Sequence, residues 1–103
     1  MRRYEMMVII RDELDEEGAQ GVVQRIRDLV EQLEGRIVDE ADWGKRKFAY
    51  EIDHQNYGWY VIFDVELSVE AKVEIERQLR ISDNVLRFLT VRPDAHVHRS
   101  KSA

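Results

Sequence analysis

Apolar and polar side chains alternate along two stretches of the chain in the pattern of a pleated strand. Residues 3–10 are rich in strand-forming types, and their even positions are Tyr4, Met6, Val8 and Ile10. Residues 59–67 carry apolar side chains at every odd position, from Trp59 to Leu67. Because successive side chains of a strand point to opposite faces, each pattern predicts a strand with one buried face. The aromatic side chains on the odd face of residues 59–67 are therefore expected in the core.

Two further stretches are predicted to be extended. Residues 36–52 form a long strand with a kink at Gly44, where a residue without a side chain permits a bulge or a sharp twist. Turn-forming residues at 53–58 would link this strand to the next one as a hairpin. The last strand covers residues 85–92 and ends at Pro93, the only proline, because proline has no N–H to donate to a neighbouring strand.

Two segments show the three- and four-residue spacing of an amphipathic helix. The first runs from residue 16 to residue 34; it begins near Asp15, in an acidic stretch that favours a helix start, and stops at Gly35. Its apolar stripe consists of Val22, Val23, Ile26, Leu29, Val30 and Leu33. The second helix opens at Ser68, ends near Arg80 and carries a narrower stripe of Ala71, Ile75 and Leu79.

The predicted order is strand, helix, strand, strand, helix, strand, within one α+β domain over residues 1–93. Helices with one apolar side and strands with one apolar face fit a two-layer sandwich, in which both helices cover one face of a four-stranded sheet. This is the ferredoxin-like arrangement. Right-handed crossovers are expected to make the first and third strands a parallel central pair in a sheet that is otherwise antiparallel, with the second and fourth strands at the edges. Residues 94–103 are predicted to be a polar tail, and the uncovered sheet face is a candidate binding surface.

The composition limits both the location and the chemistry of the chain. None of its 103 residues is a cysteine, which excludes disulfides, thiolate zinc sites and a cysteine nucleophile. No apolar run approaches the roughly 20 residues needed to span a bilayer, and the first residues are not followed by a signal-peptide apolar region. A cytoplasmic protein is therefore expected.

The net charge of −5 argues at first against nucleic-acid binding, but the charges are segregated along the chain. Residues 11–34 hold eight acids and three bases, and residues 51–76 hold seven acids and one base. Residues 77–103 hold six bases and only two acids. This distribution predicts a basic patch on an otherwise acidic body.

Patterns that would support catalysis or metal binding are weak. No glycine-rich phosphate loop, His-Glu-x-x-His zinc pattern or nucleophile elbow occurs. The acids at 12–17 fit a solvated helix start better than an acid–base pair. His96 and His98, with Asp94, lie in the predicted tail, where nothing fixes their geometry for a metal, and His54 is a turn residue. We therefore predict a binding protein with no catalytic residue, no metal and no cofactor.

Two other functions of ferredoxin-like proteins fit the sequence poorly. Small phosphatases of this fold hold phosphate in the loop after the first strand, whereas here that loop, residues 11–15, is acidic. RNA-recognition motifs carry a basic residue followed by Gly-aromatic-Gly-aromatic on a central strand, and residues 57–63 lack that signature.

Basic residues gather near the amino end, at the predicted kink and around the last strand. The candidate RNA-binding residues are Arg2, Arg3, Lys45, Arg46, Lys47, Arg80, Asn84, Arg87 and Arg92. The first and last strands are expected to be antiparallel neighbours, so Arg2, Arg3 and Arg92 would converge. The planar guanidinium of arginine suits phosphate, and the amide of Asn84 offers a donor and an acceptor to a base or a sugar. We expect the arginines and Asn84 to form or border one RNA-facing edge.

Three motifs resemble the bacterial ribosomal protein S6 family along nearly the whole chain. They are Met-Arg-Arg-Tyr-Glu at 1–5, Gly-Lys-Arg-Lys-Phe-Ala-Tyr-Glu-Ile at 44–52, and Leu-Arg-Ile-Ser-Asp-Asn-Val at 79–85. The middle segment is similar to the family's signature of glycine, basic residues and then Leu-Ala-Tyr-x-Ile, although Phe48 stands where leucine is usual.

The resemblance implies a structural constituent of the small ribosomal subunit that binds 16S ribosomal RNA in the central domain, as a heterodimer with ribosomal protein S18. It implies no catalytic residue and no cofactor. A basic partner would also reconcile the acidity of this chain with RNA binding, because the partner would supply positive charge. The alternative is a regulatory ferredoxin-like module that binds a small effector or self-associates through its open sheet.

Overall fold

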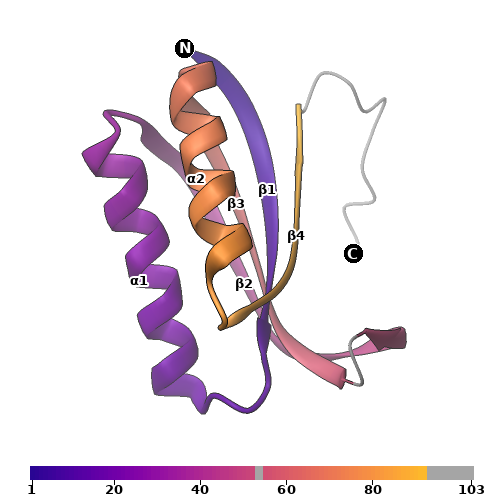
Figure 1. Ribbon diagram of the computed structural model, residues 1–103. Coiled ribbons are helices and arrows are strands. Elements are labelled where there is room, and N and C mark those ends of the chain that lie inside the picture. The colour runs from indigo at the N-terminus through magenta and orange to yellow at the C-terminus, as the bar shows by residue number, and fades with distance from the viewer. Residues whose placement is uncertain (53–54, 93–103) are drawn as a thin grey trace.

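The computed structural model describes residues 1–52 and 55–92, and six elements follow in the predicted order (Figure 1). They are β1 (Arg2–Arg11), α1 (Glu16–Gln32), β2 (Arg36–Ile52), β3 (Gln55–Leu67), α2 (Val69–Ile81) and β4 (Val85–Val91). The type and order of every predicted helix and strand are therefore confirmed. The predicted tail at 94–103 and His54 lie outside the described residues. Within the described part of the chain, neither helix is long and apolar enough to cross a membrane.

The sheet has the order β2-β3-β1-β4, and every neighbouring pair of strands is antiparallel. The predicted central and edge positions are confirmed, but the prediction of a parallel central pair is wrong, since β1 and β3 are antiparallel with Met6 opposite Phe63. The reason lies in the helical crossovers, which join β1 to β2 and β3 to β4. Each crossover skips one position in the sheet, so β1 and β2 run parallel with β3 inserted between them.

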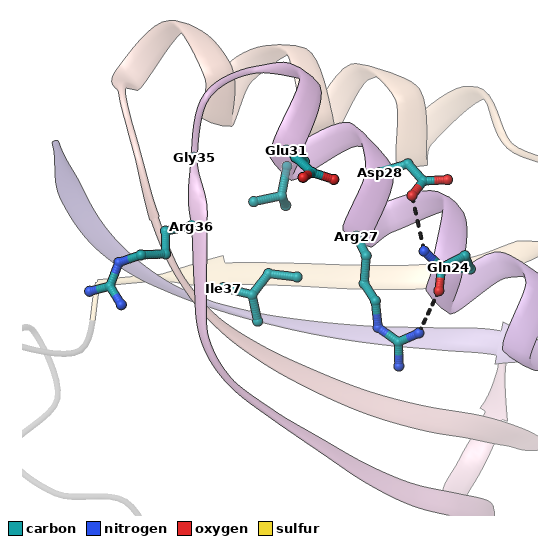
Figure 2. Close-up of a pocket in the computed structure, with 8 residues that line it drawn as sticks. Gln24, Arg27, Asp28, Glu31, Gly35, Arg36 and Ile37 are labelled. Atoms are coloured by element: carbon teal, nitrogen blue, oxygen red, sulfur yellow. Dashed lines mark hydrogen bonds between the residues drawn. The ribbon is translucent and has the colours of Figure 1, made fainter.

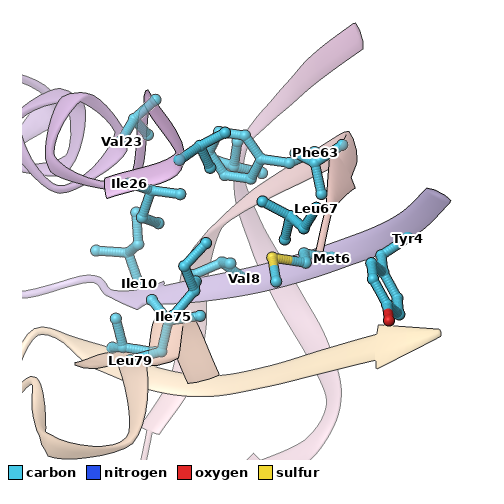
Figure 3. Close-up of a cluster of buried hydrophobic side chains, with 14 of the residues drawn as sticks. Tyr4, Met6, Val8, Ile10, Val23, Ile26, Phe63, Leu67, Ile75 and Leu79 are labelled. Carbon is cyan, nitrogen blue, oxygen red and sulfur yellow. The ribbon is translucent and has the colours of Figure 1, made fainter. Parts of the chain in front are cut away.

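Both helices lie on the same face of the sheet, and the core fills the space between the two layers (Figure 1). Figure 3 shows the buried side chains that β1, β3 and the two helices contribute. As predicted, they include the even positions of β1 from Tyr4 to Ile10 and the odd positions of β3 from Val61 to Leu67. Trp59 packs against this core, and its indole N–H donates a hydrogen bond to the carbonyl oxygen of Leu14 at 3.1 Å.

The helix starts agree with the predictions, whereas two other boundaries differ. The Asp15 side chain accepts a hydrogen bond from the backbone N–H of Gly18 at 2.8 Å and thereby caps α1. α1 ends at Gln32 rather than at residue 34, and Glu34 takes the left-handed conformation with φ of 61°. β3 begins at Gln55 rather than at residue 59, because part of the predicted turn pairs with β2.

The kink predicted at Gly44 is confirmed. Gly44 has φ of 75°, in the left-handed region that favours glycine, and the register between β2 and β3 shifts between Asp42 and Gly44.

Gly35 lies so close to β3 that a larger residue would not fit. A Cβ atom at this position would lie 2.8 Å from the backbone carbonyl oxygen of Glu66 and would also collide with the Leu67 side chain. We expect Gly35→Ala to lower the free energy of unfolding by about 1–3 kcal/mol, because the backbone of β3 would have to shift. Denaturant unfolding measures this change.

The matched control is Gly21→Ala, because a Cβ at Gly21 meets no atom within 4 Å and alanine favours the helix interior. The free energy of unfolding of this variant should be about 0.5–1 kcal/mol higher than that of the wild type. Equal stability of the Gly35→Ala variant and the wild type would contradict the close approach.

Candidate nucleic-acid interface

The predicted RNA-binding residues lie at both ends of the sheet. Glu5 of β1 pairs with Val91 of β4, so this register brings Arg92, the next residue, beside the start of β1 and near Arg2 and Arg3. Asn84 precedes the other end of β4. At about 3.3 Å per residue, Asn84 and Arg92 are roughly 26 Å apart. The edge expected from the sequence therefore extends along the whole length of β4, from Asn84 to Arg92.

Carboxylates already engage cations at the amino end of β1. Arg3 donates two hydrogen bonds to Asp64, at 2.7 and 2.8 Å, and this pairing raises the pKa of the Arg3 guanidinium. On β2, Arg36 donates to one carboxylate oxygen of Glu66 at 3.0 and 3.2 Å. These exposed ion pairs contribute little to stability. An RNA phosphate would, however, have to compete with Asp64 for Arg3.

A row of residues crosses the sheet at the opposite end. Gly58 of β3 pairs with Arg46 of β2 on one side and with Arg11 of β1 on the other. The backbone N–H of Arg11 donates to the carbonyl oxygen of Asn84 at 3.0 Å, which ties the row to the start of β4. Two positively charged side chains from different strands therefore lie in one row.

Two further predicted arginines lie along β4. Arg87 is exposed and pairs with Ile9 of β1. Arg80, in the last turn of α2, places its guanidinium 5.7 Å from the centre of the Phe88 ring of β4. This distance fits a cation–π contact, which holds the arginine at the edge of the sheet.

Aromatic rings accompany the basic triplet at the kink. The triplet consists of Lys45, Arg46 and Lys47, which pair with residues 57–59 of β3. The ammonium of Lys45 lies 5.0 Å from the centre of the Trp59 ring, and the guanidinium of Arg46 lies 5.5 Å from that of Trp43. Trp43 in turn lies nearly parallel to Tyr60, with 6.3 Å between the ring centres. The hairpin thus combines positive charge with aromatic surface.

The face of the sheet opposite the helices changes in character from one end to the other. Directly paired residues share a face, so the register groups its side chains in rows. The end row, at the amino end of β1, contains Arg36, Glu66 and Arg3. Beyond it, the first row contains Asp39, Asp64, Glu5 and Val91; the second contains Ala41, Ile62, Met7 and Leu89; the third contains Gly44, Tyr60, Ile9 and Arg87; the fourth contains Arg46, Gly58 and Arg11. The open face therefore carries four carboxylates and two ion-paired arginines at the amino end of β1, is apolar in the middle and is basic at the far end.

Arg11 was not predicted as a candidate. In the sequence it adjoins the acidic residues 12–17, which fit a solvated helix start. Its position in the alternating pattern of β1 could have identified it. Arg11 occupies an odd position, like Met7 and Ile9, and the odd positions of β1 face away from the helices.

A shallow hollow of about 360 Å³ lies between α1 and the start of β2, on the helix side of the sheet (Figure 2). Several of its polar side chains are already hydrogen-bonded. Arg27 donates to Glu40 at 2.6 and 2.9 Å and to Gln24 at 2.7 Å, and Gln24 donates to Asp28 at 3.0 Å. Among the described residues, no cluster of histidine, aspartate and glutamate could hold a metal ion. The hollow therefore gives no indication of catalysis.

Comparison with known proteins identifies a family. The family model described as Ribosomal protein S6 matches residues 3–92. The chain is 39% identical over 94 residues to the small ribosomal subunit protein bS6 of Carboxydothermus hydrogenoformans, which covers 91% of this chain and 98% of that protein. It is 42% identical over 93 residues to bS6 of Symbiobacterium thermophilum, with coverage of 90% and 98%.

A solved structure shares the fold. The crystal structure of 30S ribosomal protein S6 from Thermotoga maritima superposes with a TM-score of 0.84 at 33% sequence identity. The superposition covers 88% of this chain and 86% of that one.

Proposed function

This chain belongs to the ribosomal protein S6 family of the small ribosomal subunit, and we propose that it binds 16S ribosomal RNA of the central domain as a heterodimer with ribosomal protein S18. The observation that carries the proposal is the family match over residues 3–92, which spans all six elements of the fold. The family is one of ribosomal proteins rather than enzymes. Its place on the ribosome agrees with the cytoplasmic location expected from the sequence.

The RNA is proposed to follow the β4 edge. Arg92 with Arg2 would contact phosphates at one end, and Arg87, Arg80 and Asn84 would do so toward the other. The basic triplet Lys45 to Lys47 would extend this contact at the kink. Phosphate contacts of this kind fix the position of a protein on RNA without reading its sequence. Arg3 would join them only by exchanging its hydrogen bonds to Asp64 for bonds to phosphate.

The partner protein is proposed to cover the apolar row of the open face. This open-face patch consists of Met7, Ile62 and Leu89, with Ile9 next to it. The adjacent row holds three carboxylates, Glu5, Asp64 and Asp39, of which Arg3 binds Asp64, and it offers complementary charge to a basic partner. A partner seated there would compensate the net charge of −5 and leave the basic end of the sheet accessible to RNA.

The heterodimer can be tested with an aspartate in the open-face patch. We expect Leu89→Asp to weaken S18 binding by at least about tenfold, because an interface that buries Leu89 would have to bury an unpaired carboxylate. Isothermal titration of S18 into each variant measures the change.

Val73→Asp is the matched control, because Val73 on the outer face of α2 is 56% exposed and Leu89 is 53% exposed. This variant should bind S18 like the wild type. If the two variants bind S18 equally well, the partner does not lie on the open face. Sedimentation of the chain without S18 tests the alternative, self-association through the same patch.

A further inference from the structure

Three strands each place one arginine at the basic end of the open face. Arg46 on β2 and Arg11 on β1 flank Gly58 in the last row, and Arg87 on β4 lies opposite Ile9 in the row before it. Neighbouring strands are about 4.8 Å apart, so the Cα atoms of Arg46 and Arg11 are roughly 10 Å apart. These arginines therefore form a band of positive charge that runs across the strands, whereas the β4 edge runs along one strand.

Two of the three guanidinium groups are held by backbone oxygen atoms. Nε of Arg11 donates to the carbonyl oxygen of Asp83 at 2.7 Å, and Nε of Arg46 donates to that of Trp43 at 3.1 Å. Each bond is donated by Nε, the nitrogen nearest the side-chain stem, and it fixes the plane of the guanidinium. A cation that is already oriented loses less conformational freedom when it binds an anion.

Aromatic rings lie directly beside this band. Tyr60 pairs with Gly44 and Ile9 in the third row, and its ring lies within 10° of parallel to the Trp43 ring. Both residues are half-buried, and burial raises the pKa of the Tyr60 hydroxyl, so this side chain stays neutral. The Arg46 guanidinium lies over Trp43 as well. Flat aromatic and guanidinium surfaces are those on which unpaired bases stack.

We propose that this arginine–aromatic surface, formed by Arg11, Trp43, Arg46, Tyr60 and Arg87, binds a single-stranded RNA segment, with phosphates on the arginines and one unpaired base stacked beside Trp43 and Tyr60. The proposal rests on the proposed function and adds to it an RNA path across the open face, which joins Arg87 of the β4 edge to Arg46 at the kink. The sheet lacks the RNA-recognition signature, so the contact depends on residues at this end of the sheet alone.

The charge of the surface favours RNA over the protein partner as its occupant. The carboxylates of the open face lie at the other end, in the row where Glu5 pairs with Asp64 and in the row where Arg3 pairs with Glu66. A basic partner would be repelled by the three arginines, whereas a polyanion would be attracted. A single strand fits better than a duplex, because the bases of a duplex are already stacked on one another and cannot reach a ring.

Trp43 provides a direct reporter, since Trp43 and Trp59 are the only tryptophans in the chain. In a Trp59→Phe background, tryptophan emission of this chain comes from Trp43 alone. The titration is made with a short oligoadenylate and with an RNA duplex of equal length, first with the chain and then with its heterodimer with S18. We expect saturable quenching by the single strand in both cases and much weaker quenching by the duplex. If Trp59→Phe unfolds the chain, wild-type emission is compared with that of Trp43→Phe, in which the quenching should disappear.

Affinity measurements on variants separate binding from a merely structural role. Tyr60→Leu keeps an apolar side chain but removes the ring, and it should weaken binding of the single strand by about 5- to 150-fold, the range for loss of one base stack. Arg87→Gln should weaken it and flatten its salt dependence. Arg77→Gln is the control, because Arg77 is exposed on α2 and pairs with Glu74 at 2.8 Å, away from the open face.

The outcomes distinguish this inference from the proposed function. Suppose that the heterodimer binds the 16S fragment, that oligoadenylate does not change Trp43 emission, and that Tyr60→Leu binds the single strand like the wild type. The inference is then wrong and the proposed function stands. If S18 alone changes Trp43 emission and abolishes the response to oligoadenylate, the surface belongs to the protein partner and the inference is again wrong. If the heterodimer does not bind the 16S fragment, the proposed function fails, and the oligoadenylate titration of the chain decides the inference separately.

Discussion

Phe63→Ala is expected to lower the free energy of unfolding by about 3–5 kcal/mol, the largest effect on stability among the substitutions considered. Phe63 is the largest of the fully buried side chains, and it lies opposite Met6 at the centre of the sheet, beneath the helices (Figure 3). Its removal takes away most of the buried ring and leaves a cavity that the surrounding strands cannot close. A domain is typically stable by only about 5–15 kcal/mol, so the variant should unfold at much lower denaturant concentration.

Two controls define this result. Phe63→Leu keeps most of the volume and should cost less than about 1.5 kcal/mol. Ile81→Ala removes a side chain that is 63% exposed and should change stability by no more than about 0.5 kcal/mol. Urea unfolding measures the stability of the three variants and so gives their order. A Phe63→Ala variant as stable as Ile81→Ala would show that the odd face of β3 is not the core.

The elements of the fold could be predicted because burial imposes a period on the sequence. The alternation in β1 and β3 and the stripe of Ile75 and Leu79 in α2 correspond to the buried side chains. The direction of the central strands was predicted wrongly, because direction depends on the path of the chain between strands and leaves no periodic signal. The end of α1 was placed too late for a different reason. The sequence predicts that Gly35 stops the helix, whereas Glu34 takes the left-handed conformation after it and Gly35 lies against β3.

The part of the candidate site that depends only on which strands are neighbours could be predicted from the sequence. Adjacent antiparallel strands β1 and β4 bring Arg2 and Arg92 to one end of the sheet. Cross-strand register cannot be read from local sequence, so the pairing of Arg3 with Asp64 and the alignment of Arg11 with Arg46 through Gly58 were not anticipated. The alternation of faces along β1 would have placed Arg11, at an odd position, on the open face.

Replacement of both Arg87 and Arg92 by alanine is expected to give the largest loss of RNA affinity. Both arginines are exposed along the β4 edge, so their removal should change stability by no more than about 0.5 kcal/mol. A hydrogen bond to a charged group contributes about 1.5–3 kcal/mol, so each lost phosphate contact should weaken binding by roughly tenfold or more. Glutamate at both positions should weaken it further, because repulsion adds to the lost contacts.

A control with the same change in charge is available on the helix side. Arg25 on α1 and Arg77 on α2 are exposed and lie on the layer opposite the proposed RNA surface. Arg25→Ala combined with Arg77→Ala removes two positive charges without removing a proposed contact. This variant should show only the small loss that follows from the change in net charge.

The salt dependence of RNA binding is the most direct test of the proposed function. The measurement is the affinity of the S18 heterodimer for a central-domain fragment of 16S RNA over a range of salt concentrations, for the wild type and both double-alanine variants. Each phosphate contact releases counterions, so Arg87→Ala with Arg92→Ala should flatten the plot of log affinity against log salt by about 0.7–0.9 per contact, whereas the helix-side control should keep the wild-type slope. Wild-type affinity and slope in the β4-edge variant would contradict the account and would mean that the RNA does not bind along this edge.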